Sequence, residues 1–199
     1  MCIRDRLKLS RCGPPDLRLV LTHGFPILAM LRLPTEKSEG CANLKKGGVA
    51  VGIDIATGET VGATHNNVPI SHHPDTGEEL LGLTIPSWGS CLDLASRCYE
   101  VTGLGYLGVD LMIHRDGSPF LIETNARAGL SIQGACHAGM RSRYELLMAT
   151  CPEAATGTLA PEERARISRR LFSAQPVAVP PPSLQPGGIG AAQLAGAGV

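Results

Sequence analysis

The sequence predicts an α+β fold, in which a mostly antiparallel sheet carries flanking helices. Short apolar stretches in the first half alternate with glycine-containing turns, a pattern typical of β-hairpins. From residue 87 onward, apolar side chains recur at helical spacing. The 199 residues have a hydrophobic content of 43%, which is enough for one core.

The first hairpin is expected near the start of the chain. Strands are predicted over Leu17–Leu21 and Ile27–Leu33, with the reversal at His23 and Gly24. The next segment, Cys41–Gly48, is polar and ends on two glycines, so it is predicted to be a loop.

A second hairpin is expected over residues 49–65. Apolar residues alternate at its start, and Thr57 with Gly58 supplies the turn. Ser71–Leu80 is then predicted to be a loop. Its two histidines, His72 and His73, are treated as loop residues without a functional role.

One long helix is predicted over about Ser87–Thr102. Ser87 is a candidate N-cap and Gly103 follows the expected end. Cys91 and Cys98 fall on its apolar face, where packing is the expected role. The apolar positions at helical spacing are Trp88, Cys91, Leu92, Ala95, Cys98 and Tyr99.

The C-terminal part is expected to be simpler. Residues 131–149 predict one more helix, and a short charged helix is predicted over Pro161–Phe172, within a segment 151–172. Residues 173–199 are rich in Pro, Gly and Ala and carry no charge. They cannot bury enough apolar surface to offset their ordering entropy, so they are predicted to be disordered.

Composition argues against several classes of protein. Lys and Arg together number 18, as do Asp and Glu, so net charge gives no reason to expect nucleic acid or an anionic membrane as partner. No apolar run reaches the roughly 18 residues of a membrane span, and the start lacks a signal peptide's apolar core. Seven cysteines without a C-x-x-C pair indicate reduced thiols, so a cytoplasmic location is expected.

The third hairpin carries the candidate chemistry. With Asp116 and Gly117 as the central residues of a two-residue turn, Asp110 falls opposite Glu123. The same count places Met112 opposite Leu121. Asn125 lies two residues beyond Glu123 and therefore shares its face.

Two carboxylates directly opposite each other destabilise a sheet unless a cation lies between them. Asp110, Glu123 and Asn125 are oxygen donors, which suit a hard ion such as magnesium, and magnesium often also binds substrate phosphates. The alternative is a solvated face on which the carboxylates repel weakly through water. A slip in the turn would also break the pairing.

Basic residues near this patch are candidate anion ligands. Arg127 follows Asn125 by two and can reach an anion from the same face. Arg18 and Arg32 lie on the first two predicted strands, where an arginine either snorkels at an edge or clamps phosphate or carboxylate. The polar loop can present Lys45 or Lys46, together with glycine amides, to phosphates.

The stretch "GYLGVDLMIHRDGSPFLIETNARAGLSIQ" resembles the metal-binding end of the ATP-grasp fold, and more narrowly the RimK-like proteins related to alpha-L-glutamate ligases. The segments "DLRLVLTHGFPILAMLRLPT", "ANLKKGGVAVGIDIATG", "HHPDTG" and "RCYEVTGLGYLGVD" also resemble that group in the same order, so the resemblance covers roughly residues 16–133. The group's D…E-x-N-x-R-x-G-L pattern is matched by Asp110, Glu123, Asn125, Arg127, Gly129 and Leu130.

The resemblance implies an ATP-dependent carboxylate–amine ligase that acts through an acyl phosphate. Asp110, Glu123 and Asn125 would hold one or two magnesium ions, with manganese as a possible substitute. Catalytic roles fall to Arg32, which would stabilise the transferred phosphoryl group, and to Arg127. The phosphate or acceptor side would be lined by Asn43 and Lys45, with Arg18 as a further member.

Three departures from the family pattern limit this expectation. Ala128 replaces a usual proline, which predicts a looser turn without loss of a ligand. Residues 1–15 do not match, which leaves open a start that is not native, and the end after about residue 150 is not recognisable. The lysines, adenine hinge and glycine-rich lid of an ATP-grasp nucleotide half are missing before Asp16.

Residues 16–150 are therefore expected to be the C-terminal, magnesium- and ATP-binding portion of a ligase, inactive by itself. The alternatives are a non-catalytic nucleotide- and metal-binding module derived from an ATP-grasp enzyme, and a plain α+β domain with an acidic surface hairpin. The expected partners are a carboxylate and an amine substrate, such as an amino acid or peptide. The sequence specifies neither their identity nor the oligomeric state.

Overall fold

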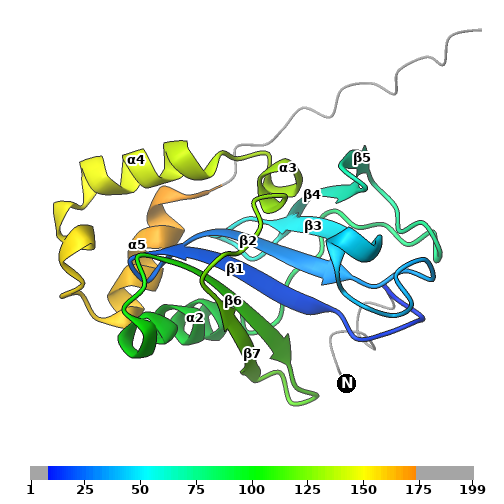
Figure 1. The fold of residues 1–199 in the computed structure, drawn as a ribbon, viewed down its shortest axis with the longest axis horizontal. Helices are drawn as coiled ribbons and strands as arrows, with labels where there is room; N and C mark the ends of the chain where they lie inside the picture. The colour runs from blue at the N-terminus through cyan, green and yellow to red at the C-terminus, as the bar shows by residue number, and fades with distance from the viewer. Residues whose placement is uncertain (1–8, 174–199) are drawn as a thin grey trace, which may run out of the picture.

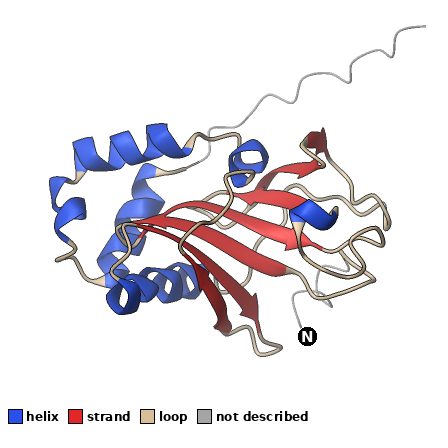
Figure 2. Cartoon of the chain, in the orientation of Figure 1, coloured by secondary structure: helices blue, strands red, loops and turns tan. Residues whose placement is uncertain are grey.

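The computed structural model describes residues 9–173 and confirms the α+β prediction (Figures 1 and 2). Seven antiparallel strands form one sheet in the order β5-β4-β3-β2-β1-β6-β7. The first two hairpins occupy adjacent positions, and β6 pairs both with the distant strand β1 and with its sequence neighbour β7. The strands are β1 (Asp16–Thr22), β2 (Phe25–Leu33), β3 (Val49–Ile53), β4 (Thr60–His65), β5 (Val68–Ile70), β6 (Tyr106–Ile113) and β7 (Pro119–Asn125).

Helices flank the sheet, with α2 and α3 on opposite sides of it in Figure 1. The long helix α2 packs against β1, β2, β6 and β7, and α5 packs against α2 and β2. The helices are η1 (Leu44–Lys46), α2 (Trp88–Thr102), α3 (Ile132–Cys136), α4 (Met140–Thr150), η2 (Pro152–Thr156) and α5 (Pro161–Leu171).

The short helix α3 approaches the sheet closely because two strands carry glycine beneath it. A Cβ atom on Gly52 would lie 2.2 Å from the Ala135 carbonyl oxygen, and one on Gly62 would lie 2.5 Å from the same atom. Neither contact is possible for a side chain, so both positions require glycine. Cys136 then donates its thiol to the Ala29 carbonyl at 3.0 Å, which fixes α3 over the sheet.

The strand period of two gives the two faces of the sheet different chemistry. On β1, Leu17 and Leu19 point into an apolar layer and are fully buried, while Asp16 and Arg18 alternate with them. Because cross-strand partners share a face, the pairing of Arg18 with Asp110 brings polar groups of β1 and β6 together on the other face. This polar face is the one that α3 partly covers.

The predicted pairing of Asp110 with Glu123 is present, but the predicted two-residue turn is wrong. His114 N–H donates to the Ser118 carbonyl, and Gly117 has a φ of 94°, so the loop contains three residues. The longer loop shifts the register by one residue. A β-bulge between the Leu111–Leu121 and Asp110–Glu123 pairs leaves Ile122 as the extra residue and restores the register.

Other elements differ in detail from the prediction. Ser87 precedes α2, but its φ is 52° and its side chain makes no capping hydrogen bond, so the capping prediction is wrong. Gly103 ends α2 in the left-handed conformation, as expected. The single helix predicted over residues 131–149 is divided into α3 and α4, because His137 adopts a left-handed conformation with a φ of 49°. Strand β5 and η2 were not expected.

The predicted helix after residue 160 is confirmed as α5. Cys91 and Cys98 are buried, as expected for packing residues, and the six cysteines among residues 9–173 are all free. Within that range, none of the helices has the length and apolarity needed to cross a bilayer. The predicted disordered tail falls almost entirely within residues 174–199, outside the described residues, as do residues 1–8.

Candidate functional site

The centre of the polar face is one buried carboxylate held by two arginines. Arg18 donates from Nε to Asp110 Oδ1 at 2.7 Å and from Nη2 to Oδ2 at 2.5 Å. Arg32 donates from Nη2 to the same Oδ2 at 2.8 Å. Such charge-assisted bonds, one of them bidentate, are the strong class of protein hydrogen bond. They allow Asp110 to remain charged while its side chain is 3% exposed.

A second carboxylate of this cluster, Asp16, was missed by the sequence analysis. It lies opposite Arg32 in the β1–β2 pairing and accepts from Arg32 Nε at 2.5 Å and from Nη2 at 2.8 Å. Arg32 therefore bridges Asp16 and Asp110. The available signal was the register of the first hairpin, but a bulge between Val20 and Leu21 shifts it.

The two buried carboxyl groups respond differently to this environment. Burial raises the pKa of Asp16, and the hydrogen bonds and charge of Arg32 only partly offset that effect. Burial also opposes the charge on Asp110, but Arg18 and Arg32 outweigh it and lower the pKa of Asp110. Burial likewise disfavours charged Arg32, and its two carboxylate partners outweigh this and raise the pKa of Arg32. At neutral pH Arg32 and Asp110 are thus held in their charged forms.

Strand β7 places two oxygen donors at the open side of this cluster. The Glu123 side chain is 59% exposed, and one carboxylate oxygen lies 3.8 Å from Arg18 Nη2. Asn125 is half-buried and its Oδ1 accepts from the Arg127 N–H at 2.8 Å. The Tyr106 hydroxyl donates to the Ala128 carbonyl at 2.6 Å, which holds the turn after β7 at the position where the family usually has proline.

A cavity of about 480 Å³ brings the predicted site residues together, a size that suits a small-molecule ligand. Asp110 is the exception, because it lies beneath Arg18 and Arg32. The cavity is lined by Asp16, Arg18, Met30, Arg32, Ala42, Asn43, Leu44, Lys45, Glu123, Asn125, Arg127, Gly129 and Ser131.

The polar loop Cys41–Gly48 contributes the Lys45 side chain to this cavity, whereas its glycine backbone amides are not available there. Asn43 caps η1 by accepting from the Lys45 N–H at 2.9 Å. Gly47 N–H donates to the Leu44 carbonyl and Gly48 N–H to the Asn43 carbonyl. The expectation that glycine amides face phosphate is therefore wrong, because the turn itself uses them. Lys45 lines the cavity.

In the observed arrangement, only some of the predicted ligands are available to bind a magnesium ion. No group of three or more His, Cys, Asp or Glu side chains is arranged for a metal within residues 9–173. Glu123 and Asn125 are oxygen donors at the cavity wall, which suits a hard cation. The metal ion was expected between Asp110 and Glu123. However, the guanidinium group of Arg18 occupies that position. Asp110 can become a ligand only if Arg18 moves.

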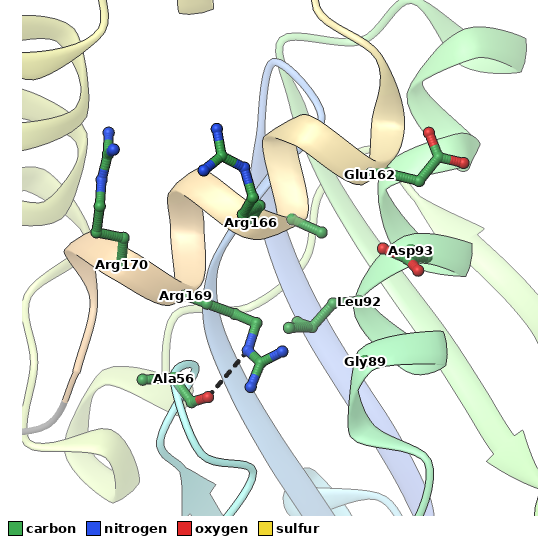
Figure 3. A pocket seen from close by; sticks show the side chains of 9 residues that line it. Ala56, Gly89, Leu92, Asp93, Glu162, Arg166, Arg169 and Arg170 are labelled. Carbon is green, nitrogen blue, oxygen red and sulfur yellow. Dashed lines mark hydrogen bonds between the residues drawn. The ribbon is translucent and has the colours of Figure 1, made fainter.

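A second cavity, of about 490 Å³, lies between α2 and α5, away from all predicted site residues (Figure 3). Its charged groups are largely matched within the protein. Arg169 donates from Nε to the Ala56 carbonyl at 3.0 Å, Arg166 pairs with Glu163, and Glu162 pairs with Arg97. We therefore place the candidate site in the cavity beside β7.

Neither curated proteins nor solved structures establish the family of this chain. A comparison with curated proteins gives no match. Among solved structures, the chain is similar to the ATP-grasp ligase PsnB complexed with minimal precursor, with 17% identity and a TM-score of 0.35. That match covers 73% of this chain and 34% of the other, so the chain spans about a third of that protein's length.

The family model of sugar-transfer associated ATP-grasp proteins matches residues 7–149, which is most of the chain. This match extends beyond residues 16–133, on which the sequence resemblance depends. The narrower RimK-like assignment stays a prediction. The chain belongs to the sugar-transfer associated ATP-grasp family.

Proposed function

We propose that this chain is the magnesium- and ATP-binding portion of an ATP-dependent carboxylate–amine ligase. The observation that carries the proposal is one cavity lined both by oxygen donors of β7 and by cationic side chains of β1, β2 and η1. Phosphoryl transfer depends mainly on neutralising phosphate charge and aligning the reactants, and this mixture of groups provides for both.

Lys45 and Arg127 are the proposed phosphate ligands. Both line the cavity, and neither side chain makes a hydrogen bond or ion pair within the described part of the chain. Arg18 and Arg32, in contrast, are engaged with Asp110. All four cationic side chains line the cavity, two of them unpaired among the described residues and two paired with carboxylates, and their positive field favours binding of a triphosphate.

Glu123 and Asn125 are the proposed magnesium ligands, and Asp110 joins them when Arg18 swings away. Magnesium, or manganese in its place, would neutralise phosphate charge and polarise the phosphoryl oxygens. Displaced Arg18 would then face the phosphates, where its charge adds to that of Lys45. Arg32 is already fixed by Asp16, so we propose that it stays in place and stabilises the charge of the transferred phosphoryl group.

In the proposed reaction a carboxylate oxygen attacks the γ-phosphorus of ATP. A new P–O bond forms as the bond to the β–γ bridging oxygen breaks, which releases ADP and leaves an acyl phosphate. The nitrogen of an amine then attacks the acyl carbon and forms a C–N bond. The C–O bond to the phosphate breaks, phosphate leaves, and the nitrogen loses a proton. A RimK-like reaction would attach glutamate or a related amino acid, in the cytoplasm.

We further propose that an additional nucleotide-binding half completes the site. Leu121 and Ile122 are neighbours on the edge strand β7, and both are nearly half exposed. Ile122 is the extra residue of the β-bulge, and together with Leu121 it leaves apolar surface open at this edge of the sheet. The polypeptide of residues 1–199 is therefore expected to bind ATP weakly and to ligate nothing by itself.

The second candidate function is a non-catalytic nucleotide- and metal-binding module. The observation that favours it is the bidentate Arg18–Asp110 pair, which occupies one predicted metal ligand. A ligase requires this pair to open when magnesium and ATP bind, whereas a binding module does not.

Isothermal titration of ATP, with and without magnesium, tests the proposed function. Glu123→Gln should lose the magnesium-dependent part of the affinity, and Lys45→Gln should weaken binding under both conditions. Glu78→Gln and Lys37→Gln are exposed controls outside the cavity and should change neither. Nucleotide binding that is indifferent to Glu123 and Lys45 would contradict the proposal. Hydroxamate formed from ATP, hydroxylamine and a carboxylate by residues 1–199 alone would contradict the need for an additional half.

A further inference from the structure

A smaller cavity adjoins the proposed nucleotide site. It has a volume of about 260 Å³, below the range of cavities that hold drug-sized ligands. The two cavities share Leu44, Lys45 and Ser131 in their linings, so they meet at the η1 turn. A ligand in the smaller cavity would therefore lie beside the phosphates in the larger one.

The floor of the smaller cavity is built from small residues at the start of β3 and just before it. Gly48 and Ala50 are both buried, and Ala50 pairs with Arg32 on one side and with Thr64 on the other. Because cross-strand partners share a face, Thr64 belongs to the same polar face as the arginine cluster. The far wall is the β4–β5 turn, where Asn66 and Asn67 have positive φ angles of 52° and 62°.

The side chains around this cavity are polar and mostly uncommitted. The Thr64 and Ser131 hydroxyls, the Asn67 amide and the Lys45 ammonium make no hydrogen bond or ion pair to any other residue that the structure describes. Asn66 contacts only the neighbouring ring of His65, at 3.3 Å. Polar groups that converge on a cavity without partners are available to a ligand.

The charge of the residues that line the smaller cavity favours the carboxylate substrate over the amine substrate. Lys45 is its one cationic residue, and no Asp or Glu lines it. A carboxylate is therefore attracted and an ammonium group is not. Hydroxyl and amide side chains match the hydroxyl groups of a ligand, since each can both donate and accept.

We propose that this cavity is the subsite for the acid substrate, and that the acid is a small hydroxylated carboxylate. Its carboxylate would lie at Lys45, on the wall shared with the nucleotide cavity, and its hydroxyl groups would bond to Thr64, Asn67 and Ser131. This assignment rests on the proposed function, since it names the substrate that receives the phosphoryl group. The amine must then approach from elsewhere.

The test uses residues 1–199 without ATP or magnesium, so that failure of nucleotide binding cannot affect it. Saturation-transfer NMR is recorded with three probes of similar size: gluconate, the uncharged sorbitol and the cationic glucosamine. Gluconate should bind most tightly. Thr64→Val should weaken gluconate at least about threefold, as expected for one lost hydrogen bond, and Lys45→Gln should reduce its advantage over sorbitol.

Thr124→Val is the matched control, because Thr124 is exposed on β7 and lines neither cavity. It should leave gluconate binding unchanged. Equal binding of gluconate and glucosamine would overturn the proposal, as would the same response to Thr64→Val and Thr124→Val. Absence of gluconate binding would overturn it as well, even if magnesium–ATP binds as proposed above.

Discussion

Strands β6 and β7 present two carboxylates in register that have different surroundings. Asp110 on β6 has a side chain that is 3% exposed, and Glu123, its partner on β7, has one that is 59% exposed. Asp110 accepts three hydrogen bonds from two arginines, whereas Glu123 forms a long ion pair with Arg18, at 3.8 Å. Sequence alone assigns both carboxylates the same role, but the structure separates them.

The difference shows that one carboxylate organises the site while the other is available to a ligand. Asp110 fixes the positions of the Arg18 and Arg32 side chains through hydrogen bonds, and its neighbours along β6 are apolar. Glu123 lies on the edge strand and keeps most of its contact with water. The comparison therefore predicts that substitutions at the two positions affect different properties: stability for Asp110, and metal binding for Glu123.

Asp110→Asn should have the largest effect, on stability. It leaves the half-buried Arg18 without its bidentate partner and Arg32 with Asp16 alone, and breaking a buried pair typically costs about 3–5 kcal/mol of unfolding free energy. Glu123→Gln should cost less than about 1 kcal/mol, because its ion pair is exposed and long. Urea denaturation monitored by circular dichroism measures both. Equal losses would contradict the division of roles.

Arg18→Gln should have the next largest effect, on metal affinity. Arg18 lies between Asp110 and Glu123, and removing a cation from beside two carboxylates favours binding of another cation. Manganese affinity should rise by about tenfold, which corresponds to about 1.4 kcal/mol, although the variant will be less stable than the wild type. The measurement is manganese-dependent relaxation of water protons, below the unfolding temperature of each variant. Weaker manganese binding would show that Arg18 does not compete with the metal.

The dependence of stability on pH should separate Asp110 from Asp16. The lowered pKa of Asp110 means that its contribution is fully present above its ordinary value of 3.8 and is lost as the pH falls through the folded-state value. The raised pKa of Asp16 has the opposite sign: its ionised form is disfavoured, so protonation at low pH relieves a cost.

Between pH 5 and pH 3, Asp110→Asn should therefore lose less stability than the wild type, and Asp16→Asn should lose more. Urea midpoints at the two pH values report both differences. Identical shifts in the two variants would contradict the assigned directions.

Tyr106→Phe should have the smallest effect. It removes the hydroxyl that donates to the Ala128 carbonyl, and one such hydrogen bond contributes about 1 kcal/mol. The turn after β7 carries Arg127, so nucleotide affinity should also fall slightly while the β6–β7 pairing remains. Thermal denaturation and ATP titration check this. Loss of the fold would contradict this prediction, because it would show that the substitution disturbs more than one hydrogen bond.

Sequence patterns predicted the strands and the long helix because alternation and helical spacing are local properties. They predicted the Asp110–Glu123 pair through a turn that is one residue shorter than the real one, and the bulge at Ile122 compensates. A similar bulge in the first hairpin concealed Asp16, because counting outward from the turn does not place it opposite Arg32. Bulges have no reliable sequence signal, so register beyond them is not predictable.

The arginine clamp was also beyond sequence reasoning. Arg18 meets Asp110 because β1 pairs with β6, and these strands are 92 residues apart at that contact. Strand order of this kind depends on packing of the whole sheet rather than on local pattern. The candidate ligands were therefore identified individually, but the position of Arg18 between two of them was not.

In the proposed function, Glu123 holds a divalent ion beside the phosphates of a nucleotide. Water-proton relaxation by manganese, titrated with ATP present into the wild type and Glu123→Gln, tests it most directly. We expect the variant to remain folded and to bind manganese at least about tenfold more weakly. Equal manganese affinity in two folded proteins would contradict it.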